Sequence, residues 1–230
     1  MDDTTMRIDQ SVIVITAAGT LIGKAMALHF ASLGAKLALV DNDINNLKAT
    51  QDACSQFSSH INIFHLEDTQ PHSIKQVFNH IQRQLGTFNV LLNTWPKCTN
   101  TPSILEPNAI NEFNDVMCNN ATTFFSVGQI AATIMQGNKQ PAVIINLALQ
   151  PSSHHTHLSD TSKSVIQGLT FGWSKELSSL NIRVGAIIPI TSDKQTMVHT
   201  RLQEEIVSCT EYIITNDSFN GRILEAECLI

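Results

Sequence analysis

The chain has 230 residues, of which 43% are hydrophobic and 15% are charged, and its formal net charge is −6. A chain of this length buries roughly 70% of its extended surface, so it can hold a full core without disulfide or metal staples. The negative charge argues against a nucleic-acid partner, and no apolar run reaches the ~18 residues of a membrane span.

Short apolar runs alternate along the chain with segments of helical period. The runs are Val12–Ile15, Leu37–Val40, Ile61–Leu66, Val90–Leu92, Val143–Leu149, Val184–Ile188 and Arg222–Ala226. Strands that are apolar on both faces and alternate with helices are typical of a parallel sheet covered on both sides. Right-handed crossovers then predict an α/β fold, a Rossmann-like doubly wound parallel sheet of about seven strands with helices on both faces.

Apolar residues at helical spacing mark the buried faces of the helices between these strands. The stripes are Ile22, Ala25, Met26, His29 and Leu33; Ile74, Val77, Phe78, Ile81 and Leu85; Phe113, Val116, Met117, Phe124, Val127 and Ile134; and Ile166, Leu169, Trp173 and Leu177. The chain has no linker and no internal repeat, which predicts a single domain over residues 1–230. The least regular stretches are Asn93–Asn108, Gln150–Leu158 and Pro189–Thr200, which all follow strands, so we expect the site at the carboxyl ends of the strands.

The beginning of the chain and its cysteines indicate a reducing compartment. The first ten residues are acidic and lack the basic and apolar regions of a signal peptide. The five cysteines are an odd number, lie far apart and form no C-x-x-C pair. We therefore expect reduced thiols and a cytoplasmic protein.

The segment from Thr16 to Gly23 runs from the first strand into a helix, whose free N–H groups form a natural seat for a pyrophosphate. It resembles the T-G-x-x-x-G-x-G turn of the short-chain dehydrogenase/reductase family, with Ala17 and Leu21 in place of two glycines. This resemblance covers about residues 8–227. It implies a dinucleotide seat at Thr16, Gly19, Ile22 and Gly23.

Acidic residues follow the next two strands. Asp41 ends the second strand, where the resemblance implies that it accepts from the adenosine ribose and favours NAD(H) over NADP(H). The alternative is that Asp41 caps the helix that starts near Ile44, which Asp43 would do equally well. Glu67 and Asp68 resemble the acidic pair of the family that meets adenine.

The fourth strand and the helix after it carry two asparagines that match the family. Asn93 matches the first residue of N-N-A-G, whereas Thr94, Trp95 and Pro96 replace the other three. Asn120 falls on the position of the catalytic asparagine, which in the family helps to hold a proton-relay water. The alternative for Asn120 is a structural bond to backbone within a buried helix.

The catalytic Y-x-x-x-K signature of the family is only half present. Lys163 stands at the lysine position, Ser159 replaces the tyrosine, and Leu149 replaces the catalytic serine. In the family, the lysine lowers the pKa of the tyrosine and binds the nicotinamide ribose. An aliphatic hydroxyl is a far weaker acid than a phenol, and Tyr212 is the chain's single tyrosine.

Three histidines, His154, His155 and His157, follow the fifth strand. They suit a polar surface loop, a substitute acid–base group or a metal ligand set, and because no fourth ligand clusters nearby we predict no metal site. The loop of about residues 190–200 is shorter than the substrate lid of the family, which weakens water exclusion.

The sequence therefore favours a short-chain dehydrogenase/reductase-like protein without standard oxidoreductase activity, which acts as a binding or assembly protein with doubtful NAD(H) affinity. The alternative is an NAD(H)-dependent oxidoreductase on a carbonyl or alcohol, with a proton relay built from Lys163, Asn120 and His155 or His157. A lyase or isomerase on the same scaffold is a further possibility. The resemblance also implies a homodimer or homotetramer formed through the helices near Asn111–Met135 and Ser159–Leu180 and through the final strand, with Phe125 and Ile130 as surplus apolar positions.

Overall fold

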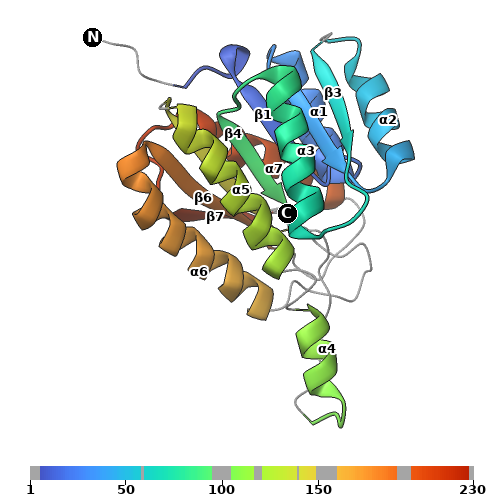
Figure 1. The fold of residues 1–230 in the computed structure, drawn as a ribbon, viewed down its shortest axis with the longest axis vertical. Helices are drawn as coiled ribbons and strands as arrows, with labels where there is room; N and C mark the ends of the chain where they lie inside the picture. The colour runs from blue at the N-terminus through green and yellow to red at the C-terminus, as the bar shows by residue number, and fades with distance from the viewer. Residues whose placement is uncertain are drawn as a thin grey trace.

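A parallel sheet forms the centre of the computed structural model, which describes residues 6–57, 60–94, 105–116, 121–138, 140–148, 160–190 and 198–227. Its seven strands lie in the order β3-β2-β1-β4-β5-β6-β7 (Figure 1). This order confirms the predicted doubly wound sheet. The strands are β1 (Val12–Thr16), β2 (Lys36–Asp41), β3 (Ile61–His65), β4 (Val90–Thr94), β5 (Ala142–Leu147), β6 (Ile182–Ile190) and β7 (Arg222–Glu227).

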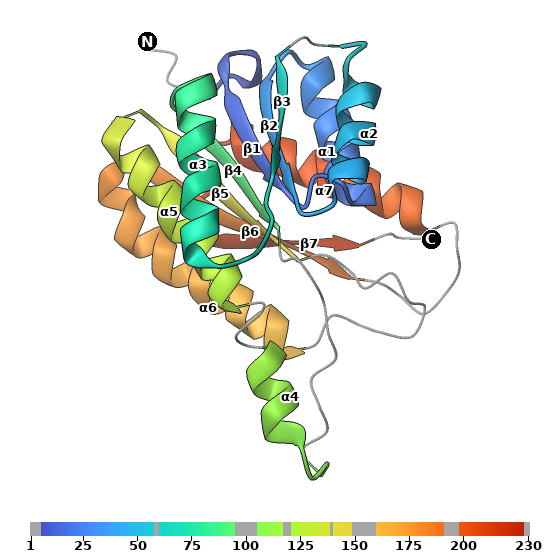
Figure 2. The same ribbon diagram turned by 45° about the vertical axis from the view of Figure 1, so that its right-hand side comes forward.

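Helices cover both faces of the sheet, as Figure 2 shows. One face carries α1 (Leu21–Ser32), α2 (Ile44–Cys54) and α7 (Val198–Thr215). The other face carries α3 (Pro71–Leu85), α5 (Thr122–Asn138) and α6 (Asp160–Leu177). Among the described residues, no helix is both long and apolar enough to cross a membrane.

The alternation of side chains along each strand supplies both layers of the core. In β1, Ile13 and Ile15 pack under α1, α2 and α7, whereas Val12 and Val14 pack under α3, α5 and α6. Successive strand residues point to opposite faces, so a strand covered on both sides is apolar at most positions. This is why the strands read as continuous apolar runs in the sequence.

The predicted buried face of α1 is wrong by about one residue. The buried residues are Gly23, Met26, Ala27, Phe30 and Ala31. His29, which the prediction placed in the stripe, lies partly exposed with its Nε2 atom 2.6 Å from Glu211 Oε2 on α7. Small residues let α1 lie close to the sheet, and their low hydrophobicity hid the true face.

The predicted core position of Phe113 is also wrong. Helix α4 (Ala109–Val116) extends away from the body of the molecule (Figure 2). Phe113, predicted to be in the core stripe, is exposed on α4, together with Ile110. Residues 117–120 between α4 and α5 lie outside the described part of the chain.

Arg183, at the start of β6, caps the end of α7. Its guanidinium donates to the carbonyl oxygens of Ile213, Ile214, Asn216 and Phe219 at 2.8–3.2 Å. Burial lowers the pKa of Arg183, and the nearby Asp217 carboxylate opposes that shift. The last carbonyls of a helix lack partners within it, so this one side chain satisfies both the helix end and the turn before β7.

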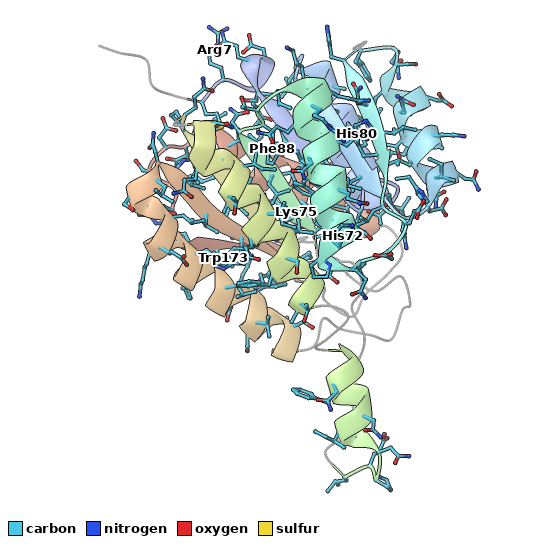
Figure 3. All side chains as sticks on the ribbon, in the orientation of Figure 1. Arg7, His72, Lys75, His80, Phe88 and Trp173 are labelled. Carbon is cyan, nitrogen blue, oxygen red and sulfur yellow. The ribbon has the colours of Figure 1, made fainter. Side chains whose placement is uncertain are left out.

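A close contact between α5 and α6 depends on Gly128. Trp173 of α6 lies between the two helices (Figure 3), and a Cβ atom on Gly128 would come within 3.0 Å of its ring. Trp173 also stacks on Phe124 at a ring-centroid distance of 6.2 Å. Because Gly128 has no side chain, the large ring of Trp173 fits between α5 and α6.

We predict that Gly128→Ala lowers the free energy of unfolding by about 1–3 kcal/mol, because the added methyl group overpacks the contact between α5 and the Trp173 ring. The matched control is Gly172→Ala in the interior of α6, where an added Cβ meets nothing within 4 Å. That change should raise stability by about 0.5–1 kcal/mol through helix propensity alone. Urea denaturation of both variants checks the prediction, and equal effects would contradict it.

Candidate functional site

The carboxyl ends of β1 and β4 mark the candidate site. The chain builds β1, β2 and β3 toward one edge of the sheet and then returns to place β4 on the other side of β1. Open parallel sheets bind ligands outside the carboxyl ends of the strands at such a reversal. Thr16 and Thr94 end these two neighbouring strands.

The turn after β1 keeps the shape of a glycine turn although its first glycine is absent. Ala17 has a φ of 53°, a left-handed conformation that side chains with a Cβ atom rarely adopt. Gly23 is irreplaceable for a different reason, because a Cβ there would lie within 3.0 Å of the Ala17 carbonyl oxygen. Ala17 and Gly23 thus each occupy a position where the backbone geometry of this turn favours glycine.

Thr20 is the N-cap of α1. Its hydroxyl oxygen accepts from the Gly23 N–H at 3.1 Å and donates to the Ala17 carbonyl oxygen at 2.8 Å. Leu21, in place of the second glycine, is the first helical residue and its side chain is 74% exposed. Ile22, predicted to belong to the dinucleotide seat, packs partly buried against the core.

Asp41 is joined to the turn. Its Oδ2 atom accepts from the Gly19 N–H at 2.8 Å and its Oδ1 atom accepts from the Asp43 N–H at 3.0 Å. Asp43, not Asp41, caps α2 by accepting from the N–H groups of Asn45 and Asn46. The capping alternative for Asp41 is therefore wrong, and its carboxylate lies beside the turn.

A third side chain holds the turn from α2. The buried hydroxyl of Thr50 shares its one proton between the Ala18 carbonyl oxygen of the turn, at 3.1 Å, and the Asn46 carbonyl oxygen of its own helix, at 3.0 Å. Sequence reasoning missed Thr50, whose signal is a polar residue on the otherwise buried face of a short helix. Together with the bonds of Thr20 and Asp41, this contact connects the turn to α2.

The ends of β1 and β4 are cross-linked by Thr16. Its hydroxyl donates to the Leu92 carbonyl oxygen at 3.1 Å and accepts from the Thr94 N–H at 2.8 Å. Asn93 is buried, and its Nδ2 donates to the Phe124 carbonyl oxygen. The Oδ1 atom of Asn93 and the Oγ1 atom of Thr94 are buried without a hydrogen-bond partner, which marks this edge as a place for a donor from a ligand or water.

Asp68 is occupied near the beginning of α3. Its Oδ1 atom accepts from the Gln70 N–H at 2.8 Å, and hydrogen bonds from the Ser73 side chain and from that N–H hold the pKa of Asp68 below its usual value. Glu67 beside it is exposed. The adenine role of Glu67 and Asp68 stays a prediction.

Lys163 lies half-buried in the first turn of α6. A helix that follows a strand in a right-handed crossover begins at the carboxyl edge of the sheet, so α6 brings Lys163 to the same edge as the turn. The remaining predicted positions lie outside the described residues: Asn120, Leu149, His154, His155, His157 and Ser159.

Two cysteines fall within the described chain, Cys54 and Cys209, and both are free. Burial raises the pKa of each thiol to about 11. A thiol with so high a pKa is a poor nucleophile at neutral pH. The described residues also contain no group of three His, Cys, Asp or Glu side chains placed to hold a metal ion.

The chain belongs to the short chain dehydrogenase family, whose sequence pattern it matches over residues 11–206. It is 27% identical over 188 residues to the 3-oxoacyl-[acyl-carrier-protein] reductase FabG of Thermotoga maritima, covering 80% of this chain and 75% of the relative. It is 21% identical over 214 residues to the 7alpha-hydroxysteroid dehydrogenase of Escherichia coli, covering 89% and 81% respectively.

Solved structures show the same fold over nearly the whole chain. A short-chain type dehydrogenase/reductase from Mycobacterium marinum superposes with a TM-score of 0.81 at 21% identity, covering 95% of this chain and 94% of that one. A 7alpha-hydroxysteroid dehydrogenase complexed with NADH and 7-oxo glycochenodeoxycholic acid gives a TM-score of 0.77 at 20% identity, covering 98% and 96%. At these identities the likeness establishes the fold.

We predict that Ala17→Gly raises the free energy of unfolding by about 0.5–1 kcal/mol. Glycine relieves a left-handed strain of about 1–2 kcal/mol, and its greater freedom in the unfolded chain offsets part of that gain. Ala18→Gly is the control, because Ala18 is fully buried beside it with a negative φ and should lose about 1 kcal/mol. Chemical denaturation distinguishes the two, and a loss of stability in Ala17→Gly would refute the strain.

Proposed function

We propose that this protein binds NAD(H) on a short-chain dehydrogenase scaffold, does not perform the standard tyrosine-dependent hydride transfer, and acts as a binding or assembly protein. The observation that supports this most directly is the position of the chain's single tyrosine. Ser159 at the tyrosine position provides no acid of comparable strength, so a standard relay would need a phenol from elsewhere.

Tyr212 lies at the wrong end of the molecule to supply it. It is near the end of α7, where its ring meets Phe219 edge-on at a centroid distance of 6.0 Å. The carbonyl of the next residue, Ile213, is capped by Arg183 at the start of β6. Tyr212 is therefore at the amino edge of the sheet, whereas Lys163 begins α6 at the carboxyl edge.

The residues present fit a dinucleotide. The turn has a glycine-like shape at Ala17 and a close approach at Gly23, and the unpartnered atoms of Asn93 and Thr94 lie at the ends of the same strands. We assign pyrophosphate binding to the backbone at the beginning of α1, because the Gly19 and Gly23 N–H groups already donate to Asp41 and Thr20. Bound NADH would supply a hydride, but the residues assigned here hold and orient it.

The carboxylate of Asp41 sets the preference for the cofactor. It lies beside the turn with both oxygens fixed by backbone N–H groups, so its negative charge stays where the adenosine ribose would lie. A 2′-phosphate there would meet a like charge. In this proposal Lys163 and Asn93 meet the nicotinamide half, and Glu67 and Asp68 the adenine.

Assembly is the second half of the proposal. Phe125 on α5 and Phe171 on α6 are 40% and 46% exposed on the helices that cover one face of the sheet. Large exposed aromatic side chains are enriched at protein interfaces. We propose a cytoplasmic homodimer or homotetramer, with a further protein partner as the alternative occupant. We also propose that residues 1–230 form one domain with a shortened lid at about residues 190–200.

The relatives favour a second candidate function. Those named above are called reductases or dehydrogenases. An NAD(H)-dependent oxidoreductase would need a non-standard relay from Lys163, Asn120 and His155 or His157.

We predict that NADH binds with a micromolar dissociation constant and that NADPH binds at least about tenfold more weakly, because Asp41 repels the extra phosphate. Asp41→Asn should reduce the difference in affinity between NADH and NADPH. Asp43→Asn, two residues away in an exposed cap, should leave it unchanged. Titration by NADH fluorescence measures both, and equal affinities in the unaltered protein would contradict the assignment of Asp41.

We predict no oxidation of NADH by the unaltered protein on a panel of aldehydes and ketones. Ser159→Tyr should create measurable turnover if the rest of the pocket survives, because it restores a phenol four residues before Lys163. Turnover by the unaltered protein that vanishes in Lys163→Ala would instead establish the second candidate.

A further inference from the structure

We infer that Thr170 and Asn146 are positioning residues that fix the first turn of α6 and hence the ammonium group of Lys163. The inference rests on the proposed function, in which Lys163 meets the nicotinamide half of NAD(H). The resemblance gave neither residue a role, and neither is proposed to touch a ligand. The inference rests on a buried network of hydrogen bonds that runs from the sheet to α6.

The hydrogen-bond network joins three polar side chains that lie on three different elements. The hydroxyl of Thr170 on α6 accepts from Asn146 Nδ2 of β5 at 2.9 Å and donates to the Ile166 carbonyl oxygen at 2.7 Å. Asn146 Oδ1 accepts from Asn93 Nδ2 of β4 at 3.2 Å. That same nitrogen donates to the Phe124 carbonyl oxygen of α5 at 3.1 Å.

These polar groups are deeply buried, which makes the bonds energetically important. Asn146 and Thr170 are 0% exposed and Asn93 is 1% exposed. A buried polar group that loses its partner keeps its desolvation cost, so a satisfied network favours one arrangement strongly over its neighbours. The assignment of the Asn93 amide is also internally consistent, because reversing it would set its oxygen against two other oxygens.

Apolar packing alone would not hold the register of α6. Its buried residues Ile166, Trp173 and Leu177 fix the distance from the sheet, but dispersion contacts have little directionality. A hydroxyl–amide hydrogen bond weakens steeply when its angle changes. The bond from Asn146 to Thr170 therefore helps to fix the rotation and axial position of the helix against β5, and a longer bond of 3.3 Å from Asn220 Nδ2 to the Ser174 carbonyl oxygen holds the far part of the helix.

Lys163 shares the anchored face of α6. It precedes Thr170 by seven residues, which is about two helical turns or ~10.5 Å along the axis. The bond from Thr170 to the Ile166 carbonyl oxygen lies within α6, and the bond from Asn146 is the one that ties this face to the sheet. A rotation of α6 would thus displace the lysine ammonium at the carboxyl edge of the sheet, where it has to meet the cofactor.

The test is Thr170→Val, which keeps the shape of the side chain and removes its hydroxyl. Thr210→Val on α7 is the matched control, because Thr210 is equally buried and also donates to the carbonyl four residues before it. Thr210 belongs to the opposite face of the sheet and has no asparagine partner. Thr170→Ser restores the hydroxyl and should rescue the variant.

Two readouts separate positioning from stability. The first is the dissociation constant of NADH, which should rise about tenfold in Thr170→Val and stay unchanged in Thr210→Val. The second needs no cofactor: the rate at which acetic anhydride labels Lys163, followed by mass spectrometry and normalised to Lys175 in the same helix. The ratio of the Lys163 to the Lys175 labelling rate should change severalfold in Thr170→Val and return to the value of the unaltered protein in Thr170→Ser.

The outcomes are distinct. If the unaltered protein does not bind NADH, the proposed function fails while the labelling ratio still decides this inference. If Thr170→Val only lowers the melting temperature, as Thr210→Val does, and leaves both readouts unchanged, the inference is overturned. If Thr170→Val does not fold, Asn146→Ala applies the same readouts from the strand side, because Thr170 keeps its bond to Ile166; an unchanged ratio in that variant also overturns it.

Discussion

The approach of α1 to the end of β1 at Gly23 is the contact on which the candidate site depends. A side chain there would collide with the Ala17 carbonyl oxygen, so only glycine lets the helix begin directly above the turn. Ala17 adopts a left-handed conformation in the same turn, and Gly19 donates to Asp41 there. The beginning of α1, the carboxylate beside it and the cap of Thr20 thus meet within one short turn that has no room for a Cβ atom at Gly23.

The fold was readable from the sequence because its dominant constraint is local. A strand of a sheet covered on both faces is mostly apolar, and runs such as Val12–Ile15 that alternate with helical segments are typical of it. The face of α1 was not readable, because Ala27 and Ala31 bury little area and His29 can pair with a residue far along the chain. Nor did the pattern reveal that Phe113 is exposed on α4, since hydrophobic spacing does not show whether another element packs on a helix face.

The sequence predicted site residues only where the residue type itself points to one role, such as a glycine at a close backbone approach. Thr16 bonds to the end of β4, Gly23 lies against the Ala17 carbonyl and Asp41 accepts from Gly19, and their roles toward a cofactor stay predictions. Thr50, Asn146 and Thr170 were missed because their roles arise from partners many residues distant. Asn146 did carry a signal, as a polar residue in an otherwise apolar strand, since a buried amide must find partners across the sheet. Ser159 and Asn120 were assigned from resemblance, and the described residues do not reach them.

The hydrogen bonds of the Arg183 guanidinium bear on whether the protein keeps its fold after cleavage of the backbone. It ties the end of α7 and the turn before β7 to β6 without using the covalent connection between them. Together with the pairing of β6 and β7, it makes residues 198–227 a piece that the remainder can recognise. Backbone scission between residues 190 and 198 would therefore yield two fragments that reassociate, and complementation of a split chain would be possible at that point.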